Sequence, residues 1–337
     1  QTPASLPRAT LLLFALASGL AVANAYFAHP LLDAMADAVG LPRARAGLIV
    51  AATQVGYGLG LILLVPIGDL VDRRRLVIAQ SLLSVLALGA IAAATSGGML
   101  LAAMATMGLL AVVTQAHVAF AASLAPPATR GQVVGTVTSG IVLGILLARV
   151  VAGGLADVAG WRAVYLASAL FTLLVVGLLA RALPPAPRPA AAIAYPRLIA
   201  SLFHLLATER VLQVRGVIAL LIFAAITCLL TPLVLPLSAP PWSLSHAAIG
   251  LFGLAGVAGA LAASRAGRWT DRGFGQRTTG IALALMLAAW APIALLQHSI
   301  LWLVIGVVVI DFGLQATHVT NQAMIYRVRP EAQSRLT

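Results

Sequence analysis

Two charged residues lie deep inside otherwise apolar stretches, where any chemistry would take place out of contact with bulk water. Arg149 stands in the apolar run 132–156 and Asp311 in the run 299–325. A charge at the centre of a membrane costs about 2.5–3.5 kcal/mol on insertion scales, so each needs a functional or structural reason. An aspartate can bind and release a proton, and an arginine can bind an anion. The two residues therefore predict a proton-coupling or anion site, with a structural ion pair as the alternative.

Two histidines stand in matching sequence contexts. His117 follows Gln115 in Gln-Ala-His-Val, and His318 follows Gln315 in Gln-Ala-Thr-His-Val. Histidine titrates near neutral pH, so either residue could join a proton relay. The alternative is a hydrogen-bonded packing residue, which is the commoner role of a single histidine in a helix bundle. The duplicated glutamines favour a polar cavity.

Further polar residues lie in the first two apolar stretches. Such groups could orient a small-molecule substrate in a cavity. Hydrogen bonding between neighbouring helices explains them equally well. The residues are Asn24, Tyr26, Gln54 and Tyr57.

Composition places the chain in a membrane. Of its 337 residues 61% are hydrophobic and only 9% are charged, which is too little polar surface for a water-soluble protein of this length. The net charge is +12, but the arginines form no basic patch with interleaved aromatic residues, so nucleic acid is not the expected partner. Cys228 is the single cysteine, and no disulfide is expected. The partner that the composition predicts is the lipid bilayer.

Ten apolar stretches are long enough to cross a bilayer, whose core takes about 20 helical residues. Their apolar residues do not alternate with polar ones as in barrel strands, so the chain is predicted to be an all-α membrane protein. The predicted spans are 10–31, 46–67, 76–95, 98–124, 132–156, 162–183, 212–236, 246–267, 277–297 and 299–325.

Arginines are distributed unequally between the two sides of these spans. Arg43, Arg45 and Arg162 fall on one side, and seventeen fall on the other. Positive loops stay in the cytoplasm during insertion, so both termini are predicted to be cytoplasmic, in a bacterial inner membrane. The seventeen are Arg8, Arg73, Arg74, Arg75, Arg130, Arg181, Arg188, Arg197, Arg210, Arg215, Arg265, Arg268, Arg272, Arg277, Arg327, Arg329 and Arg335.

The longest polar stretch separates six spans from four. It opens with several prolines, which are typical of a stiff, extended tether. Farther along it, leucines recur at helical spacing beside charged residues, which predicts an amphipathic helix on the membrane surface, or else a plain linker helix. The predicted domains are an N-terminal bundle over 1–183, a cytoplasmic linker over 184–211 and a C-terminal bundle over 212–337.

A charged loop signature of the form Gly-x-x-x-Asp-Arg occurs twice, after the second span and after the eighth. Its duplication predicts two pseudo-symmetric halves, as in a transporter that rocks one half against the other. Its carboxylates would gain from a neighbouring helix N-terminus, whereas a simple turn with topology-setting arginines is the alternative. Because a repeated six-helix unit has twelve spans, the chain is predicted to be truncated by two. The copies contain Gly68, Asp72 and Arg73, and Gly267, Asp271 and Arg272.

Small residues within the predicted spans would allow helices to pack closely, because a glycine lets two helix backbones approach. This expectation concerns packing and is weak evidence for transport. The glycines are Gly56, Gly58, Gly60, Gly140 and Gly144.

Both copies of the signature resemble the hallmark loop motif of the major facilitator superfamily, and the resemblance covers essentially the whole chain. Residues 148–153, followed by Gly160-Trp161-Arg162, are similar to the superfamily's helix-five antiporter motif, although Arg149 stands where proline is usual. The sequence Ala23-Asn24-Ala25-Tyr26 is similar to the end of helix one in bacterial drug and sugar efflux members.

This resemblance implies a major-facilitator-type helical bundle with ten of twelve helices present, working as a monomer. It implies a secondary transporter that exports a small amphipathic molecule in exchange for protons, with no cofactor. In the family the first-loop acid contacts helix eleven and the second-loop acid contacts helix five, which latches the inner gate.

Two other functions compete with transport. One is an inert membrane fragment. The other is an intramembrane hydrolase built on Ser139, for which the chain lacks a Gly-x-Ser-x-Gly elbow. It also lacks a His-Glu-x-x-His metal motif and a nucleotide-binding loop, so neither a metal nor ATP is expected.

Overall fold

The computed structural model describes residues 7–126, 130–183, 194–252, 266 and 269–326, and these contain helices but no strand. The all-helical class is therefore confirmed. The first part of the chain forms α1 (Arg8–Tyr26), η1 (His29–Leu31), α2 (Leu32–Ala38), η2 (Arg43–Arg45), α3 (Gly47–Leu63), η3 (Val65–Asp69), α4 (Arg73–Ala92), α5 (Gly97–Ala111), α6 (Val113–Leu124), α7 (Arg130–Ala159) and α8 (Trp161–Ala182). The rest forms α9 (Tyr195–Thr208), α10 (Arg210–Ser238), α11 (His246–Gly250), η5 (Thr270–Phe274), α13 (Gly275–Ala288), α14 (Trp290–Ala294) and α15 (Ile300–Tyr326).

Nine helical stretches within the described residues are long and apolar enough to cross a membrane. They correspond to nine of the ten predicted spans. The tenth, predicted over 246–267, falls largely on residues outside those that the structure describes.

The chain divides into two compact units by its internal contacts. Unit 1 contains residues 1–199 and 233–250, and unit 2 contains residues 200–232 and 251–337. The helix α9 occupies the segment predicted to be amphipathic, and its position on a membrane surface stays a prediction, as do the predicted domain boundaries.

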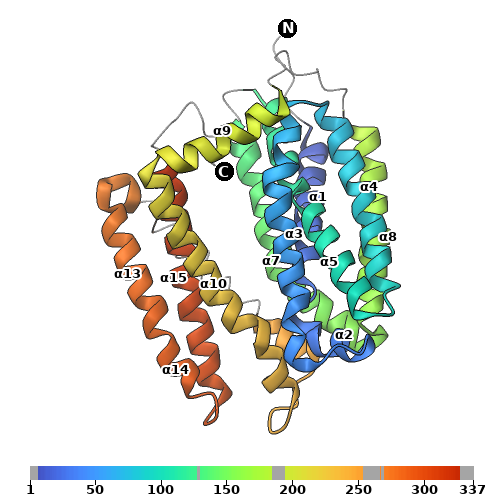
Figure 1. Cartoon of the computed structure of the whole chain (residues 1–337), viewed down its shortest axis with the longest axis vertical. Coiled ribbons are helices and arrows are strands. Elements are labelled where there is room, and N and C mark those ends of the chain that lie inside the picture. Colours follow the sequence, from blue (N-terminus) through green and yellow to red (C-terminus); the bar gives the residue numbers. More distant parts are fainter. Residues whose placement is uncertain (1–6, 127–129, 184–193, 253–265, 267–268, 327–337) are drawn as a thin grey trace. The chain divides into compact units, whose positions relative to one another are not determined.

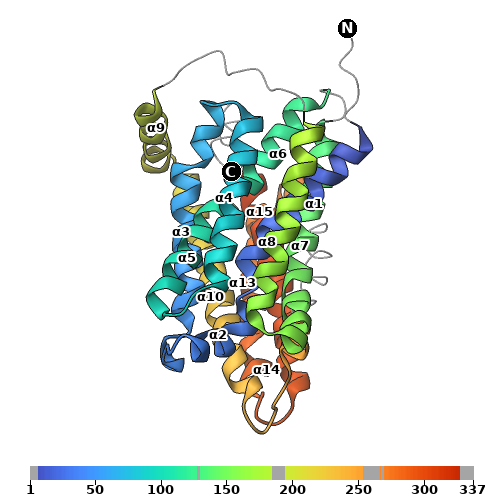
Figure 2. The same cartoon turned by 90° about the vertical axis from the view of Figure 1, so that its right-hand side faces the viewer.

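Helices of unit 1 run side by side (Figures 1 and 2), and small residues bring their backbones together. A Cβ atom on Gly140 would overlap the carbonyl oxygen of Ala15, and one on Gly144 would overlap that of Gly19, so α7 lies directly on α1. In the same way Gly56 and Gly60 of α3 lie against the backbone of α5. Lipid supplies little hydrophobic drive between helices, so this close packing holds them together.

The prediction was wrong for one glycine of the five. A Cβ atom on Gly58 would meet no atom within 4 Å. Gly56 and Gly60 are four residues apart and share one face of α3, whereas Gly58 lies between them and points elsewhere.

A tight turn joins α7 to α8. Gly160 has a φ of +81°, which side chains with a Cβ rarely adopt. Just beyond it, Arg162 donates to the carbonyl oxygens of Ala92 at 3.1 Å and Ala94 at 2.9 Å. This fixes the start of α8 to the end of α4, the helix on which α8 packs.

Unit 2 is built around α15, which packs along α13 and α14. Gly306 of α15 lies against Ala289 and Ile293, and Gly313 lies against Ala282 and Met286. Close contacts through glycine therefore recur in both units.

Candidate functional site

The first loop signature forms a capped helix start. The carboxylate of Asp72 accepts hydrogen bonds from the backbone amides of Arg74 at 2.8 Å and Arg75 at 3.3 Å. This satisfies amides that the first turn of a helix leaves without partners, and a negative charge there also suits the helix dipole. The guanidinium of Arg74 donates to the carbonyl oxygen of Ala180 at 2.6 Å, so the signature fixes the start of α4 to the end of α8.

Other members of the signatures are placed as follows. Gly68 lies in η3, and Arg73 donates to the carbonyl oxygen of Ala119 at 3.4 Å. Of the second copy, Gly267 and the side chain of Asp271 lie outside what the structure describes, and Arg272 is exposed. Contacts of the two acids with partner helices stay predictions. The glycine after Arg272, Gly273, has a φ of +90°, which kinks the chain within η5, just before α13.

The structure brings together two residues predicted for the pathway, Arg149 and Tyr26. The guanidinium carbon of Arg149 lies 5.9 Å from the centre of the Tyr26 ring, within the usual range of a cation–π contact. The ring of Tyr26 also stacks with that of His29, with the ring centres 5.6 Å apart and an angle of 16° between the ring planes. His29 is buried at 6% exposure, and its ring nitrogens have no hydrogen-bond partner among the described residues. This stack joins the end of α1 to the middle of α7.

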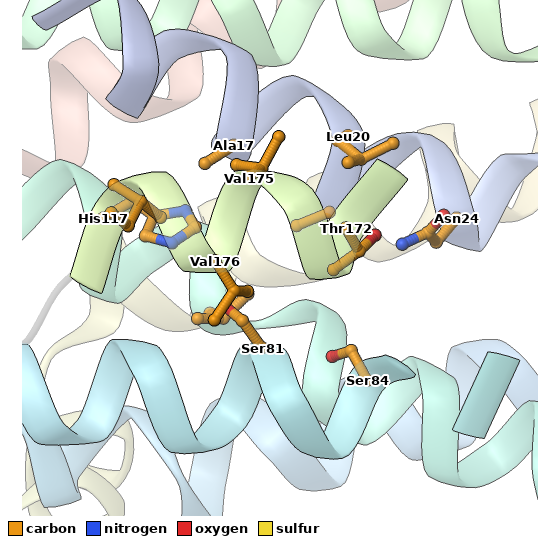
Figure 3. A pocket seen from close by; sticks show the side chains of 12 residues that line it. Ala17, Leu20, Asn24, Ser81, Ser84, His117, Thr172, Val175 and Val176 are labelled. Carbon is orange, nitrogen blue, oxygen red and sulfur yellow. The ribbon is translucent and has the colours of Figure 1, made fainter. Parts of the chain in front are cut away.

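Two more predicted residues, Asn24 and His117, line one small cavity inside unit 1 (Figure 3). The cavity has a volume of about 10 Å³, which suits roughly one water molecule. Three polar atoms of its lining are buried without a partner among the described residues: Asn24 Nδ2, His117 Nε2 and Thr172 Oγ1. On their other sides, Asn24 Oδ1 accepts from Ser168 at 2.5 Å, and His117 Nδ1 lies 3.3 Å from Ser18 Oγ. The cavity therefore combines a mostly apolar lining with a few buried polar groups.

Three predicted residues of unit 2 lie on one face of α15. Asp311, Gln315 and His318 are spaced by four and three residues, and all three are half-buried. The ring of His318 meets the edge of Phe223 at 5.4 Å. A stripe of this kind, in an otherwise apolar helix, can bind a proton at its carboxylate.

The remaining predicted residues belong to none of these three groups. Gln54 is exposed and Tyr57 is half-buried on α3, and Gln115 is half-buried on α6. Arg149 and Asp311 belong to different units, so a shared site for them stays a prediction.

Sequence reasoning missed a buried cation in unit 2. The charge count places Arg215 among the arginines of the cytoplasmic side, but its side chain is buried within α10, at 2% exposure. Its guanidinium donates to Thr279 Oγ1 at 2.8 Å and to Asn321 Oδ1 at 3.2 Å. Asn321 in turn donates to the Arg215 carbonyl oxygen at 3.3 Å. Arg215 therefore ties α10 to α13 and α15.

Replacing Arg215 with methionine is expected to destabilise unit 2 by about 1–3 kcal/mol, because the Asn321 oxygen is left buried without its donor. Thermal unfolding of the purified protein in detergent measures this as a lower Tm. Arg210→Met is the matched control, since Arg210 lies on the same helix and is exposed. Equal changes in Tm for the two variants would contradict the assignment.

A second missed cluster lies at the end of unit 1 away from the first loop signature. His246 lies between two aspartates: Nδ1 is 3.0 Å from Asp157 Oδ1, and Nε2 is 3.1 Å from Asp33 Oδ1. The hydrogen bond to Asp33, with a further contribution from Asp157, raises the pKa of His246 above its usual value of 6.5. No sequence signal links these three residues, because each is a solitary polar residue near the end of an apolar stretch.

Among the residues that the structure describes, no three His, Cys, Asp or Glu side chains gather closely enough to hold a metal ion.

Comparison with known proteins gives a consistent family. The sequence profile of the Major Facilitator Superfamily matches residues 14–337. The chain is 43% identical to the "Uncharacterized transporter YgaY" of Escherichia coli O157:H7 over 98% of its own length and 83% of that protein. It is 33% identical to a Streptomyces coelicolor protein named "Probable transporter SCO4007", over 93% of this chain and 73% of that protein.

The fold also matches solved structures. A bacterial homolog of the human lysosomal transporter Spinster, in an inward-facing and occupied conformation, superposes with a TM-score of 0.78. The match covers 97% of this chain and 76% of the other, at 14% sequence identity. At that identity the likeness establishes the fold.

Proposed function

Because the chain belongs to the major facilitator superfamily, and is a membrane transporter of that family rather than an enzyme, we propose that it exports a small amphipathic molecule in exchange for protons. The observation that carries this proposal is Asp311, a half-buried carboxylate on a polar stripe of the membrane-spanning helix α15. A carboxylate in such a helix can change its protonation as the helix is exposed to one side of the membrane and then the other.

Alternating access is the proposed route. The substrate would bind in a central cavity between the two predicted bundles, near the bilayer midplane, as in transporters built from repeats. Arg149 with Tyr26, and Asp311 with Gln315 and His318, are the residues that we assign to this pathway. Protons, a small-molecule substrate and the bilayer are the proposed partners, and a monomer is the proposed working form.

The arginines at one end of unit 1 support an orientation of the chain in the membrane. Within unit 1, the start of α4 and the end of α8 meet at an end that carries Arg73, Arg74 and Arg75. By the positive-inside rule we assign this end to the cytoplasm of a bacterial inner membrane, together with both termini. The opposite end of unit 1, with Asp33, Asp157 and His246, would then face outward.

We expect Asp311→Asn to reduce substrate-dependent proton flux to the level of membranes without the protein, because an amide side chain does not bind and release a proton as a carboxylate does. Inside-out vesicles with an imposed pH gradient would be tested against a panel of amphipathic drugs and sugars. A pH-sensitive dye would report the protons that each substrate releases. Substrate exchange without a gradient, which needs no net proton movement, should persist in Asp311→Asn.

Two controls make this test specific. Asp311→Glu should retain the flux, because the carboxylate is kept. Asp37→Asn should also retain it, because the Asp37 side chain is 54% exposed and forms a surface ion pair with Arg43. Proton flux that is unchanged in Asp311→Asn would remove Asp311 from the coupling role. Transport that is insensitive to the pH gradient in the unmodified chain would overturn proton coupling itself.

A further inference from the structure

His246 lies between two carboxylates, in a geometry that suits the binding of a proton. Its two ring nitrogens lie 3.0 Å and 3.1 Å from carboxylate oxygens of Asp157 and Asp33, respectively. An ionised carboxylate only accepts hydrogen bonds, whereas a neutral imidazole can donate from one nitrogen alone. With two ionised carboxylates and a neutral imidazole, only one of the two contacts can be a hydrogen bond. Both can be hydrogen bonds only if the cluster binds one additional proton. The protonated form of His246, which donates from both nitrogens, meets this condition.

The same contacts hold a short segment of chain against α7. The backbone amides of His246 and Ala247 donate to the two carboxylate oxygens of Asp157, at 3.1 Å and 2.9 Å. A Cβ atom on Gly153 would overlap the carbonyl oxygen of His246. Farther along, a Cβ atom on Gly250 would overlap the carbonyl oxygen of Arg149. The segment 246–250 is therefore docked backbone to backbone on α7, with the proton site at its first residue.

Few other ionisable groups surround His246, Asp33 and Asp157. Besides the three groups of the site, η1 contributes His29, and α7 contributes Arg149, which lies over Tyr26, and Arg130 at its first residue. Arg43 also interacts electrostatically with Asp33. The side chains of His246, Asp33 and Asp157 are 26%, 14% and 28% exposed. Water can therefore deliver and remove the proton.

We propose that His246, Asp33 and Asp157 form a proton-operated latch that keeps segment 246–250 docked on α7 while its proton is bound. This inference rests on the proposed alternating-access function, in which His246 belongs to the C-terminal bundle and the two aspartates to the N-terminal bundle. Loss of the proton would leave two carboxylates facing a neutral imidazole and release the segment. Proton binding from outside would close this end of the transporter.

The direction of the pH dependence follows from linkage. Docking gives His246 two acceptors and raises its pKa. The stability that this adds to the docked state is fully present below the undocked pKa of about 6.5 and is lost as pH rises through the docked pKa. The docking equilibrium constant falls by up to about tenfold for each pH unit between these two values. Alkaline external pH should therefore open the latch.

Cysteine labelling can measure docking directly. In a Cys228→Ser background, Ile249→Cys places a thiol on the docked segment, at a position that is 6% exposed. Val158→Cys is the matched control, because Val158 lies near the end of α7 and is 87% exposed. A membrane-impermeant maleimide would be reacted with each variant of the full chain in proteoliposomes. The labelling ratio is the rate for Ile249→Cys divided by the rate for Val158→Cys, and taking this ratio cancels the intrinsic pH dependence of the thiol.

In the parent, the labelling ratio should be low and independent of pH below pH 6.5. Above that pH it should rise, by up to about tenfold per pH unit. In His246→Gln it should be high at all pH values. In His246→Arg, which keeps a charge and its donors, it should stay low at alkaline pH. A ratio that is independent of pH in the parent, or that rises in His246→Gln as it does in the parent, overturns the latch.

A second measurement guards against a cysteine variant that fails to fold. Histidine-labelled protein without new cysteines gives NMR titrations, and the His246 signal is assigned by its loss in His246→Gln. A pKa for His246 at or below 6.5 would also overturn the proposal. Neither readout uses a transported substrate, so a failed transport assay and a failed latch are distinguishable.

Discussion

Replacing Gly144 with leucine is expected to destabilise the protein by more than about 3 kcal/mol, beyond the usual cost of overpacking of about 1–3 kcal/mol. The reason is the kind of atom that the new side chain would meet. A Cβ atom at this position would overlap the backbone carbonyl of Gly19, and a backbone atom cannot rotate away as a side chain can. The helices α1 and α7 would have to separate, which breaks one of the two most extensive helix contacts of unit 1.

Gly135→Leu is the matched control for Gly144→Leu. Gly135 lies on the same helix, and a Cβ atom there would meet no atom within 4 Å. Both variants make the same change in helix propensity and in apolar volume. Thermal unfolding in detergent, together with the yield of monodisperse protein, should show a large loss for Gly144→Leu and a small change for Gly135→Leu. Similar losses in both would mean that the close approach of α1 and α7 contributes little.

Much of this fold could be predicted because lipid imposes simple rules on a sequence. Each span must be long, apolar and helical, so hydropathy alone located nine spans that the structure describes. The duplicated signature with its adjoining motifs led to the superfamily that the comparisons confirm. Glycine spacing predicted the contact faces of Gly56, Gly60, Gly140 and Gly144, although not the outward direction of Gly58.

The clusters were harder to predict, because their members are far apart in the chain. Asp33, Asp157 and His246 come from α2, α7 and α11 and have no shared motif. Each looks like an ordinary polar residue at the edge of a span. Arg215 was misread for a related reason: an arginine near the start of a span resembles a topology-setting charge. Only packing reveals that Thr279 and Asn321 surround it.

Some of the polar residues that stand out against an apolar stretch lie near one another in the structure, while their roles in a transport pathway stay predictions. Arg149 and Tyr26 lie together, and Asn24 and His117 line one cavity. Neither pairing could be derived from spacing, because each joins helices that are distant in sequence. Their residue types were informative, whereas their partners were not.

Gly153→Val should undock segment 246–250 by shape alone, without any change in charge. A Cβ atom on Gly153 would overlap the carbonyl oxygen of His246, and because the backbone fixes the position of a Cβ atom, no side-chain rotation relieves this overlap. Because the segment could no longer lie on α7, His246 would lose both carboxylates. Its pKa should return to about 6.5, the value of an unperturbed histidine.

Gly154→Val provides the comparison, since a Cβ atom on this neighbouring residue would meet nothing within 4 Å. Both variants carry the same β-branched side chain in the same turn of α7, so their helix propensities change equally. The histidine titration should show the lowered pKa of His246 only in Gly153→Val, and labelling of a cysteine at position 249 should become fast and independent of pH only there. If Gly154→Val behaved like Gly153→Val, the effect would belong to α7 itself and not to the docked segment. If neither variant changed the pKa, the aspartates would hold His246 without help from the backbone contact.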